Sequence, residues 1–254
     1  MVAPADNPFR LDGKVALVTG AGRGIGRGVA LALGAAGAET VVNSRTPVEL
    51  EAVASEIAAG GGRARALPFD VTDSERARAA IAGIGRLDIL VNNAGMNRPQ
   101  PFLEVDDTTL DHMIALNVKA AFIVAQAAAR QMVEAGSGVI VNMSSQMGHV
   151  GSERNRTAYV MTKHAVEGLT KAMAVELAPK GVRVVSIAPT FVVTPLTKPF
   201  FDDPETRKWI IDRIPLGRAG TVEEVANAVV FLCSPAAALV TGSSLLADGG
   251  WTAW

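Results

Sequence analysis

The sequence predicts an α/β fold: a doubly wound, seven-stranded parallel sheet with helices on both faces. From Lys14 onward, short apolar runs rich in β-branched residues alternate with longer runs rich in Ala and Leu, as crossover helices require. Several short runs are apolar throughout, which is typical of strands covered on both sides. A glycine-rich turn follows the first run directly. In a parallel sheet, such a turn leads into the first crossover helix.

Seven apolar runs are the predicted strands. They span residues 15–18, 40–42, 64–69, 89–91, 139–141, 182–187 and 244–246. Helices fill the gaps, most clearly at 110–134, where Ala and Met recur at helical spacing. No internal repeat, low-complexity tract or linker interrupts the pattern, so we predict a single domain over residues 1–254.

Composition points to a small-molecule partner. The 254 residues are 49% hydrophobic and 19% charged, and the formal net charge of -1 provides no field that would attract nucleic acid or an anionic membrane. The single cysteine, Cys233, excludes an intrachain disulfide. Residues 1–12 carry no apolar run like a signal peptide, and no uninterrupted apolar span approaches 20 residues. We therefore expect a cytoplasmic protein with no membrane partner.

The first turn has the composition of a phosphate-binding loop. Residues 19–26 read Thr-Gly-Ala-Gly-Arg-Gly-Ile-Gly and lead into a helix expected at 27–36. Glycines allow a sharp turn that brings backbone N–H groups close to an anion, and the helix N-terminus adds a favourable dipole. Between a first strand and its helix, this turn predicts a Rossmann-like dinucleotide site. The expected contacts are Gly20, Arg23, Gly24, Ile25 and Gly26.

The end of the second strand favours NADP(H), with NAD(H) as the alternative. No carboxylate that could bind the adenosine ribose hydroxyls occurs there before Glu49. Ser44 and Arg45 stand at this position instead, and the guanidinium of Arg45 suits a 2'-phosphate, with Arg23 as a second cation. The competing interpretation is that both arginines are solvated surface charges.

Two further polar turns are predicted to extend the same groove. Asp70 and Val71 are expected to close the third strand, and Asn93, Ala94 and Gly95 follow the fourth. Ligands of open parallel sheets bind beyond the carboxyl ends of the strands. Asp70 could accept a hydrogen bond from an adenine amino group, while the small residues at 94–95 allow close approach of the middle of the cofactor.

Tyr159 and Lys163 lie four residues apart at the start of a helical pattern, so both side chains share one helix face. A neighbouring ammonium favours the phenolate, which predicts a Tyr159 pKa below its usual value of about 10. Such a phenol could exchange a proton with an alcohol or a carbonyl. The alternative is an ordinary surface pair.

Ser145 ends the fifth strand, where its hydroxyl could lie beside the phenol. Asn117 could interrupt the helical ladder and hold a water, or could be a buried amide.

In order and spacing, these motifs resemble the classical short-chain dehydrogenase/reductase family over residues 11–250. The motifs are Thr19-Gly20-x-x-x-Gly24-x-Gly26, Asn92-Asn93-Ala94-Gly95, Asn117, Ser145 and Tyr159-x-x-x-Lys163. The resemblance implies NAD(P)(H)-dependent interconversion of a secondary alcohol and a ketone or aldehyde. It also implies that Tyr159 is the general acid/base and that Lys163 lowers its pKa and binds the nicotinamide ribose. Ser145 would orient the substrate oxygen, and Asn117 would support a water-linked proton relay.

The resemblance also implies cofactor contacts after the sixth strand, from Pro189, Val192 and Thr194. The family commonly has Pro-Gly where this chain has Pro189-Thr190. Residues 190–216, rich in prolines and aromatic side chains, are expected to form a lid over the substrate.

The substrate pocket is expected to include Met96, Ser145, Gln146, His149 and Tyr159, with Asn97 nearby. These polar candidates resemble the sugar, polyol and sugar-acid dehydrogenases of the family. His149 could bind substrate, although a loop histidine without a catalytic role is the simpler interpretation. Arg154 or Arg156 could meet an acidic substrate group, but solvated surface arginines are the commoner case.

Other expectations remain open at this stage. The histidines show no metal-ligand spacing, so no metal is expected. By resemblance, the C-terminal tail ending at Trp254 and the Ala-rich helical faces at 110–134 and 157–177 would pack in a homotetramer. One alternative function is reduction of 3-oxoacyl thioesters. A second alternative is a nucleotide-sensing protein without catalysis.

Overall fold

A computed structural model describes residues 7–253, and Trp254, with its predicted role in the tail, lies outside them. Seven parallel strands form one sheet in the order β3-β2-β1-β4-β5-β6-β7, which confirms the predicted doubly wound α/β fold. The strands are β1 Val15–Thr19, β2 Glu39–Asn43, β3 Arg63–Ala66, β4 Ile89–Asn92, β5 Gly138–Met143, β6 Val182–Pro189 and β7 Ser244–Ala247.

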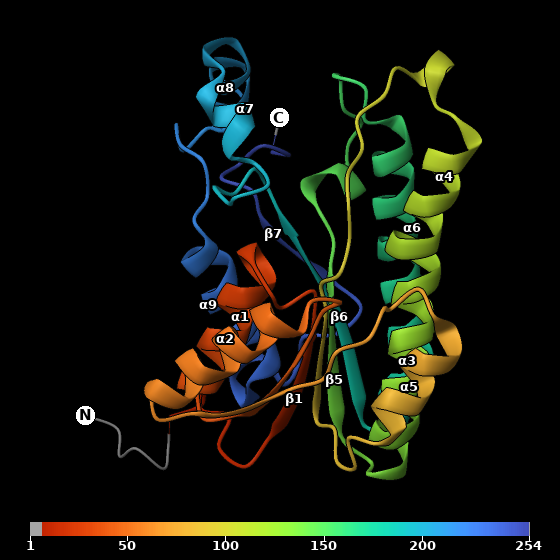
Figure 1. Ribbon diagram of the computed structural model, residues 1–254, viewed down its shortest axis with the longest axis vertical. Coiled ribbons are helices and arrows are strands. Elements are labelled where there is room, and N and C mark those ends of the chain that lie inside the picture. Colours follow the sequence, from red (N-terminus) through yellow and green to blue (C-terminus); the bar gives the residue numbers. More distant parts are fainter. Residues whose placement is uncertain (1–6, 254) are drawn as a thin grey trace.

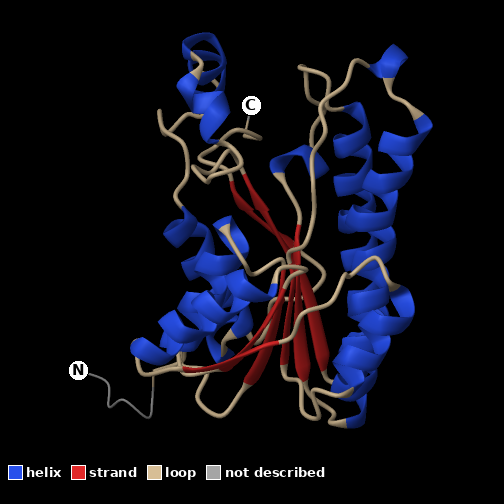
Figure 2. Cartoon of the chain, in the orientation of Figure 1, coloured by secondary structure: helices blue, strands red, loops and turns tan. Residues whose placement is uncertain are grey.

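Helices cover both faces of the sheet (Figures 1 and 2). One layer contains α1 Gly24–Ala35, α2 Pro47–Ala59 and α9 Val222–Cys233, and the other contains α3 Ser74–Ala82, α4 Asp107–Ile114, α5 Ala121–Glu134 and α6 Thr157–Leu177. Successive side chains of a strand point to opposite faces. Val18 and Val42 therefore join the core under the first layer, whereas Leu17 joins the core under the second.

The third strand is shorter than the predicted 64–69, because β3 ends at Ala66. Beyond Ala66 the chain still follows β2, because the Leu67 N–H donates to the Val42 carbonyl at 2.9 Å and the Phe69 N–H to the Ser44 carbonyl at 3.2 Å. The Asn43 amide then donates to the carbonyls of Leu67 and Phe69, at 3.0 and 3.1 Å, and holds the departing segment. Asp70 therefore lies in a loop beyond the strand and does not close it. Helix α1 likewise begins at Gly24, inside the glycine turn, and not at residue 27.

The long helix predicted at 110–134 starts earlier and has a π-helical middle. Asp106 caps its start by accepting from the Thr109 N–H at 2.7 Å. Helix α4 then runs into a π-helical segment, η3 Ala115–Ala120, before α5 continues. By length and composition, Asp107–Glu134 could cross a membrane, but half of its most apolar window is buried in the fold. Core helices of water-soluble proteins pass the same test.

The segment expected to be a lid carries two short helices, α7 Lys198–Asp202 and α8 Pro204–Ile211. Both project beyond the carboxyl ends of the strands, near the described C-terminal residues (Figure 1). Phe200, Phe201 and Trp209 of these helices pack in one apolar cluster with Tyr159 of α6. The lid therefore covers the end of the sheet where the predicted catalytic residues stand.

Candidate active site

The turn between β1 and α1 has a shape that only glycines permit. Gly20 and Gly24 have φ values of +65° and +57°, in the left-handed region. A Cβ on Gly26 would collide with the carbonyl oxygen of Gly20. No side chain caps the start of α1 at Arg23, so its first N–H groups stay open to a ligand. These features fit the diphosphate of a dinucleotide.

The turn after β4 is fastened to this glycine turn. Thr19 Oγ1 accepts hydrogen bonds from the backbone N–H groups of Asn93 and Ala94, both at 3.0 Å. The Asn93 side chain donates back to the Thr19 carbonyl at 2.9 Å. The structure thus brings the predicted groove residues of the first and fourth strands together.

Ser44, Arg45 and Asp70 lie where the adenosine half of the cofactor was predicted. Arg45 Nη1 lies 3.9 Å from Asp70 Oδ2, and the Arg45 side chain is 79% exposed, so its guanidinium is available to a ligand. Partial burial pushes the pKa of Asp70 up, but hydrogen bonds from Thr72 and the charge of Arg45 outweigh it, so this pKa lies below its usual value. Val71 is buried in the core beside this end of the groove.

Sequence reasoning missed Glu49 at this end of the groove. A Cβ built on Gly22 would collide with Glu49 Oε2 and lie 3.3 Å from Ser44 Oγ. The carboxylate therefore reaches back to the glycine turn from the first turn of α2. The available signal was that Glu49 is the first carboxylate after the second strand and lies in the first turn of the helix that follows it.

Ser145, Tyr159 and Lys163 come together at the end of β5. The Ser145 hydroxyl lies beside the Tyr159 phenol and acts to lower its pKa. Lys163 is buried; its Nζ donates to the Met143 carbonyl at 2.7 Å and lies 5.6 Å from the centre of the Tyr159 ring. Phenol, hydroxyl and ammonium thus form the predicted constellation.

The predicted pKa shift of Tyr159 is wrong for this structure. Burial raises the pKa of the phenol above its usual value, although the Ser145 hydrogen bond and the Arg156 charge oppose the rise. The Lys163 ammonium faces the ring and is bonded to a carbonyl, so it does not offset the burial of the phenol oxygen. Burial also lowers the pKa of Lys163 to about 8, against the opposing charge of Glu167.

Asn117 lies in the π-helical segment and bridges three elements. Its Oδ1 accepts from the Met96 N–H at 2.9 Å, and its Nδ2 donates to the Met96 carbonyl and to Thr162 Oγ1 at 2.8 and 3.1 Å. The predicted interruption of the helical ladder is therefore present, and the buried-amide interpretation also holds. A Cβ on Gly95 would lie 3.3 Å from Asn117 Oδ1 and 3.8 Å from Lys163 Nζ, which places all three residues in one site.

Two of the predicted pocket residues carry buried polar atoms without partners. Gln146 is 1% exposed, and neither atom of its amide has a hydrogen-bond partner among the described residues. Asn97 Oδ1 is likewise buried and unmatched within the described chain. Buried polar groups normally find partners, so these amides are suited to hydroxyl groups of a ligand.

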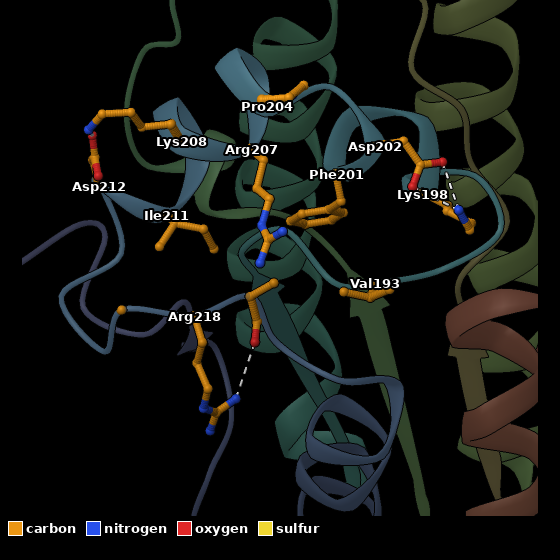
Figure 3. Close-up of a pocket in the computed structure, with 12 residues that line it drawn as sticks. Val193, Lys198, Phe201, Asp202, Pro204, Arg207, Lys208, Ile211, Asp212 and Arg218 are labelled. Atoms are coloured by element: carbon orange, nitrogen blue, oxygen red, sulfur yellow. Dashed lines mark hydrogen bonds and ion pairs between the residues drawn. The ribbon is translucent and has the colours of Figure 1, made fainter.

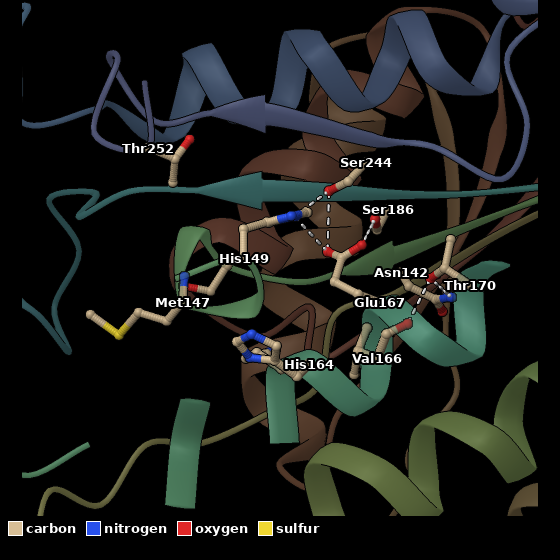
Figure 4. A network of polar contacts seen from close by, with 12 residues as sticks. Asn142, Met147, His149, His164, Val166, Glu167, Thr170, Ser186, Ser244 and Thr252 are labelled. Carbon is tan, nitrogen blue, oxygen red and sulfur yellow. Dashed lines mark hydrogen bonds and ion pairs between the residues drawn. The ribbon is translucent and has the colours of Figure 1, made fainter. Parts of the chain in front are cut away.

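His149 is engaged in a separate polar network (Figure 4). Its Nε2 lies 2.9 Å from Ser244 Oγ and 3.2 Å from Glu167 Oε1. Ser186 Oγ donates to the other Glu167 oxygen at 2.8 Å. The network joins α6 to β6 and β7, so the contacts of His149 have a structural role. Its contact with the substrate remains a prediction.

The chain after β6 approaches the glycine turn. Pro189 ends β6, and Val192 forms an isolated bridge with Gly220. The Thr194 side chain lies 3.7 Å from a Cβ built on Gly24, and its backbone N–H donates to Thr197 Oγ1 at 2.9 Å. Thr194 is thus close to the glycine turn, and its contact with the cofactor stays a prediction.

Arg156 is not the solvated surface residue that was the commoner expectation. Its side chain is buried, and its guanidinium lies over the rings of Phe191 and Phe200, 4.9 and 5.5 Å from their centres. Arg154, two residues earlier, is exposed and lies over Trp209. The two arginines of this loop therefore differ in their surroundings.

A cavity of about 830 Å³ lies beside the lid and outside the catalytic cluster (Figure 3). Its walls come from α7, α8 and the segment before α9, including Phe201, Arg207 and Arg218, and include none of Ser145, Tyr159 and Lys163.

Among residues 7–253, no group of three or more His, Cys, Asp or Glu could hold a metal ion. Cys233 is buried, which raises its pKa to about 12 and leaves it a poor nucleophile.

Comparisons with known proteins agree with this geometry. Residues 20–252 match the family described as enoyl-(acyl carrier protein) reductase. The chain is 43% identical to L-xylulose reductase of Bos taurus, over 96% of this chain and 99% of the relative. It is 42% identical to galactitol 2-dehydrogenase (L-tagatose-forming) of Cereibacter sphaeroides, over 97% of this chain and 98% of the relative.

A solved structure supports the same assignment. The crystal structure of a gluconate 5-dehydrogenase from Burkholderia cenocepacia, in complex with NADP and tartrate, superposes with a TM-score of 0.93 at 38% identity, over 97% of this chain and 98% of that one. Fold, motif order and relatives all agree. The chain belongs to the classical short-chain dehydrogenase/reductase family of NAD(P)(H)-dependent oxidoreductases.

Proposed function

We propose that this enzyme interconverts a small polyhydroxylated secondary alcohol and the corresponding ketone, with NADP(H) as the preferred cofactor. One observation carries the proposal. The cluster of Ser145, Tyr159 and Lys163 lies at the same end of the sheet as the glycine turn. The unmatched amide atoms of Gln146 and Asn97 favour a substrate with several hydroxyl groups. The relatives named for sugars and polyols support the same class.

The residues that would hold the cofactor form a continuous groove. The diphosphate fits the open N–H groups at Gly24, Ile25 and Gly26, and the 2'-phosphate suits Arg45 with help from Arg23 and Ser44. The remaining predicted contacts are Gly20, Asp70, Val71, Asn93, Ala94, Gly95, Tyr159, Lys163, Pro189, Val192 and Thr194. When bound, the cofactor donates or accepts the hydride.

Tyr159 would move the proton at the substrate oxygen. A raised pKa keeps the phenol protonated near neutral pH, as a donor to the carbonyl oxygen during reduction requires. The Ser145 hydroxyl, which lies beside the phenol, would hold the same substrate oxygen in line. Lys163, with its pKa of about 8, keeps a positive charge beside the phenol below that pH. Asn117 would position the Met96 backbone and support the relay.

The experiment that tests this function is a substrate panel with purified enzyme. NADPH absorbance would be followed with ketoses and their alditols of four to six carbons, with an acetoacetyl thioester and with a steroid ketone. We expect turnover of at least one polyhydroxylated substrate and a higher kcat/KM for it than for the others. Turnover of the thioester alone would support the alternative reductase, and cofactor binding without any turnover would support a nucleotide sensor.

The thioester alternative has less support from the lid. A basic patch near the crevice would favour an acyl carrier partner. Three basic lid residues are instead paired with carboxylates: Lys198 with Asp202, Lys208 with Asp212 and Arg213 with Glu153. Arg218, just after the lid, is paired with Glu224.

We also propose a cytoplasmic homotetramer. Large apolar side chains are exposed along the second helical layer, including Phe122 of α5, Met161 and Val175 of α6, and on the edge strand at Leu246 of β7. Contiguous exposed apolar surface marks association sites. A buried free cysteine and a nicotinamide cofactor suit a reducing compartment.

A further inference from the structure

We propose that Arg156 binds a carboxylate of the substrate, so that the preferred substrate is a polyhydroxylated monocarboxylate and not a neutral polyol. The proposal rests on the function proposed above and narrows its substrate class. Four features of the site carry it: the burial of Arg156, the unpaired state of its guanidinium, its position beside the catalytic phenol and the strained loop that places it there.

Arg156 is a buried cation without a counterion. Its side chain is 4% exposed, and its Nε and Nη1 atoms are buried without hydrogen-bond partners in the described chain. No ion pair involves Arg156 among residues 7–253, although Arg213 and Arg218 nearby both have carboxylate partners. A buried charge destabilises the folded protein unless a group of opposite charge pairs with it. The missing partner of Arg156 is therefore an anionic group of a ligand.

The aromatic rings around Arg156 do not replace that anion. The centres of the Phe191 and Phe200 rings lie 4.9 and 5.5 Å from the guanidinium carbon, and the Nε and Nη1 atoms remain without hydrogen-bond partners in the described chain. Those N–H groups form a planar fork that matches a carboxylate with two parallel hydrogen bonds. Burial lowers the pKa of Arg156, and the charge of Arg154 lowers it further, while the Tyr159 phenol opposes both effects. A bound anion would stabilise the charged guanidinium.

Arg156 stands beside the reacting group. It lies three residues before Tyr159, and its two aromatic neighbours belong to the same packed cluster as the Tyr159 ring. The guanidinium and the phenol lie close enough for the charge of each group to act on the pKa of the other. A short sugar acid could therefore reach both residues, with its hydroxyl groups toward Gln146.

The loop before Arg156 is strained. Arg154 and Asn155 have φ values of +62° and +63°, which residues with a side chain adopt rarely. The Asn155 carbonyl accepts from the Gln100 N–H at 2.9 Å and helps to hold this conformation. Strained backbone persists where the surroundings impose it, and it clusters at ligand sites. Here the strained residues Arg154 and Asn155 directly precede Arg156, whose side chain points into the protein.

A carboxylate fits better than a phosphate. A phosphate monoester carries close to two negative charges at neutral pH and normally needs more than one cation. Arg156 is the only basic side chain of this loop that is buried in the described chain, because Arg154 is exposed and stacked on Trp209. A single guanidinium balances a single carboxylate.

The test compares matched acids and neutral polyols. Aldonates of four to six carbons, among them D-gluconate, are assayed with NADP⁺ against the alditol of the same length, and D-sorbitol 6-phosphate serves as the phosphate arm. We expect at least one aldonate to exceed its alditol in kcat/KM by about tenfold or more, as one desolvated ion pair allows. A preference for the alditols or for the sugar phosphate would overturn the proposal.

The variant Arg156→Gln separates substrate recognition from catalysis. We expect kcat/KM for the aldonate to fall about 100-fold, mainly through KM, with a change below about tenfold for the alditol. Arg156→Lys should recover part of the loss. The control Arg154→Asn removes an exposed guanidinium from the same loop, and asparagine tolerates its positive φ; it should change aldonate kcat/KM by less than about threefold. Equal losses on acid and alditol would contradict the assignment.

Thermal unfolding with bound NADPH, which cannot oxidise an aldonate, gives a readout without turnover. Without substrate, Arg156→Met should unfold at a higher temperature than the wild type, because it removes an unpaired buried charge. D-gluconate should raise the unfolding temperature of the wild type and not of the variant. A lower unfolding temperature of the variant, with gluconate stabilising both, would assign Arg156 a structural role. No turnover of any polyol, acid or ketose would instead refute the proposed function.

Discussion

Tyr159 and Lys163 show why adjacency in sequence does not fix protonation. Their i to i+4 spacing correctly predicts that the two side chains lie on one helix face. The direction of the phenol's pKa shift depends on how deeply its oxygen is buried and on where the ammonium points. Both depend on Met143 of β5 and on the lid, which lie far from Tyr159 in the sequence.

The raised pKa of Tyr159 can be measured directly, because Tyr159 is the only tyrosine in the chain. Titration of the cofactor-free enzyme at 295 nm should show a midpoint above pH 10. The folded phenol holds its proton where the unfolded phenol loses it, so its contribution to stability is present below pH 10 and is lost as pH rises through the folded pKa. Alcohol oxidation, which needs the phenolate, should speed up with pH in the same range. A midpoint at or below 10 would show that Lys163 outweighs burial.

Arg45 is expected to set the choice of cofactor, since its exposed guanidinium is the cation beside the adenosine end of the groove. Replacement by Asp removes the partner of the 2'-phosphate and adds a repulsive charge. The KM for NADP(H) should rise about tenfold or more, the value of a lost charge-assisted hydrogen bond, while that for NAD(H) stays the same or falls. Steady-state kinetics with both cofactors decide this. Equal changes for the two cofactors would remove the 2'-phosphate assignment.

At the scale of elements, the π-helical segment is the feature that ties the helical layer to the site. Three hydrogen bonds from the Asn117 amide hold the Met96 backbone and Thr162. We expect Asn117→Leu to lower the free energy of unfolding by about 2 to 3 kcal/mol, because it leaves the half-buried backbone groups of Met96 without their partners and removes the bond to Thr162. Turnover should fall as well.

A matched variant separates these contributions. Thr162→Val leaves both bonds to Met96 intact. It removes the third bond of Asn117 and a local bond from Thr162 Oγ1 to the Tyr159 carbonyl of the same helix, and should cost about 1 kcal/mol. Both variants are compared by urea unfolding. If the two cost the same, the bonds to Met96 contribute nothing and the π-helical segment is set by backbone packing alone.

The strands were predictable because burial on both faces leaves continuous apolar runs, as 89–91 and 139–141 show. The end of the third strand was missed because the apolar run continues to Phe69, whereas the Asn43 side chain of β2 binds the carbonyls of Leu67 and Phe69 beyond the strand's end. The π-helical step follows from Asn117 and its partners on other segments, which local periodicity cannot reveal. The burial of Arg156 depends on Phe191 and Phe200, about 40 residues away in the chain.

At the scale of the whole molecule, the catalytic groups come from distant segments that only the sheet order brings together. Parallel strands β1, β4, β5 and β6 all end at the same edge, where their turns carry the glycine loop, Gly95, Ser145 and Thr194. The motif order in the sequence was enough to predict this convergence. The sequence predicted a lid-like segment but not how α7 and α8 cover the site, because the aromatic side chains that pack there belong to no sequence motif.

Assembly is the whole-molecule property that the exposed apolar surface predicts. Light scattering after size-exclusion chromatography should give four times the chain mass. Val175→Glu places a charge on a 78% exposed apolar position of α6 and should shift the mass toward dimer or monomer. The control Val48→Glu changes a 72% exposed valine of α2, on the opposite layer, and should leave the mass unchanged. A wild type that elutes as a stable monomer would end the tetramer proposal.

The most direct test of the account is Tyr159→Phe, measured with the best substrate of the panel. This variant removes the proton donor while the glycine turn and Arg45 stay intact. The account predicts that kcat falls by about 1,000-fold or more, within the range of a lost general acid, while the Kd for NADPH changes by less than about threefold. A kcat within tenfold of the wild type would contradict the central claim that this phenol carries the proton.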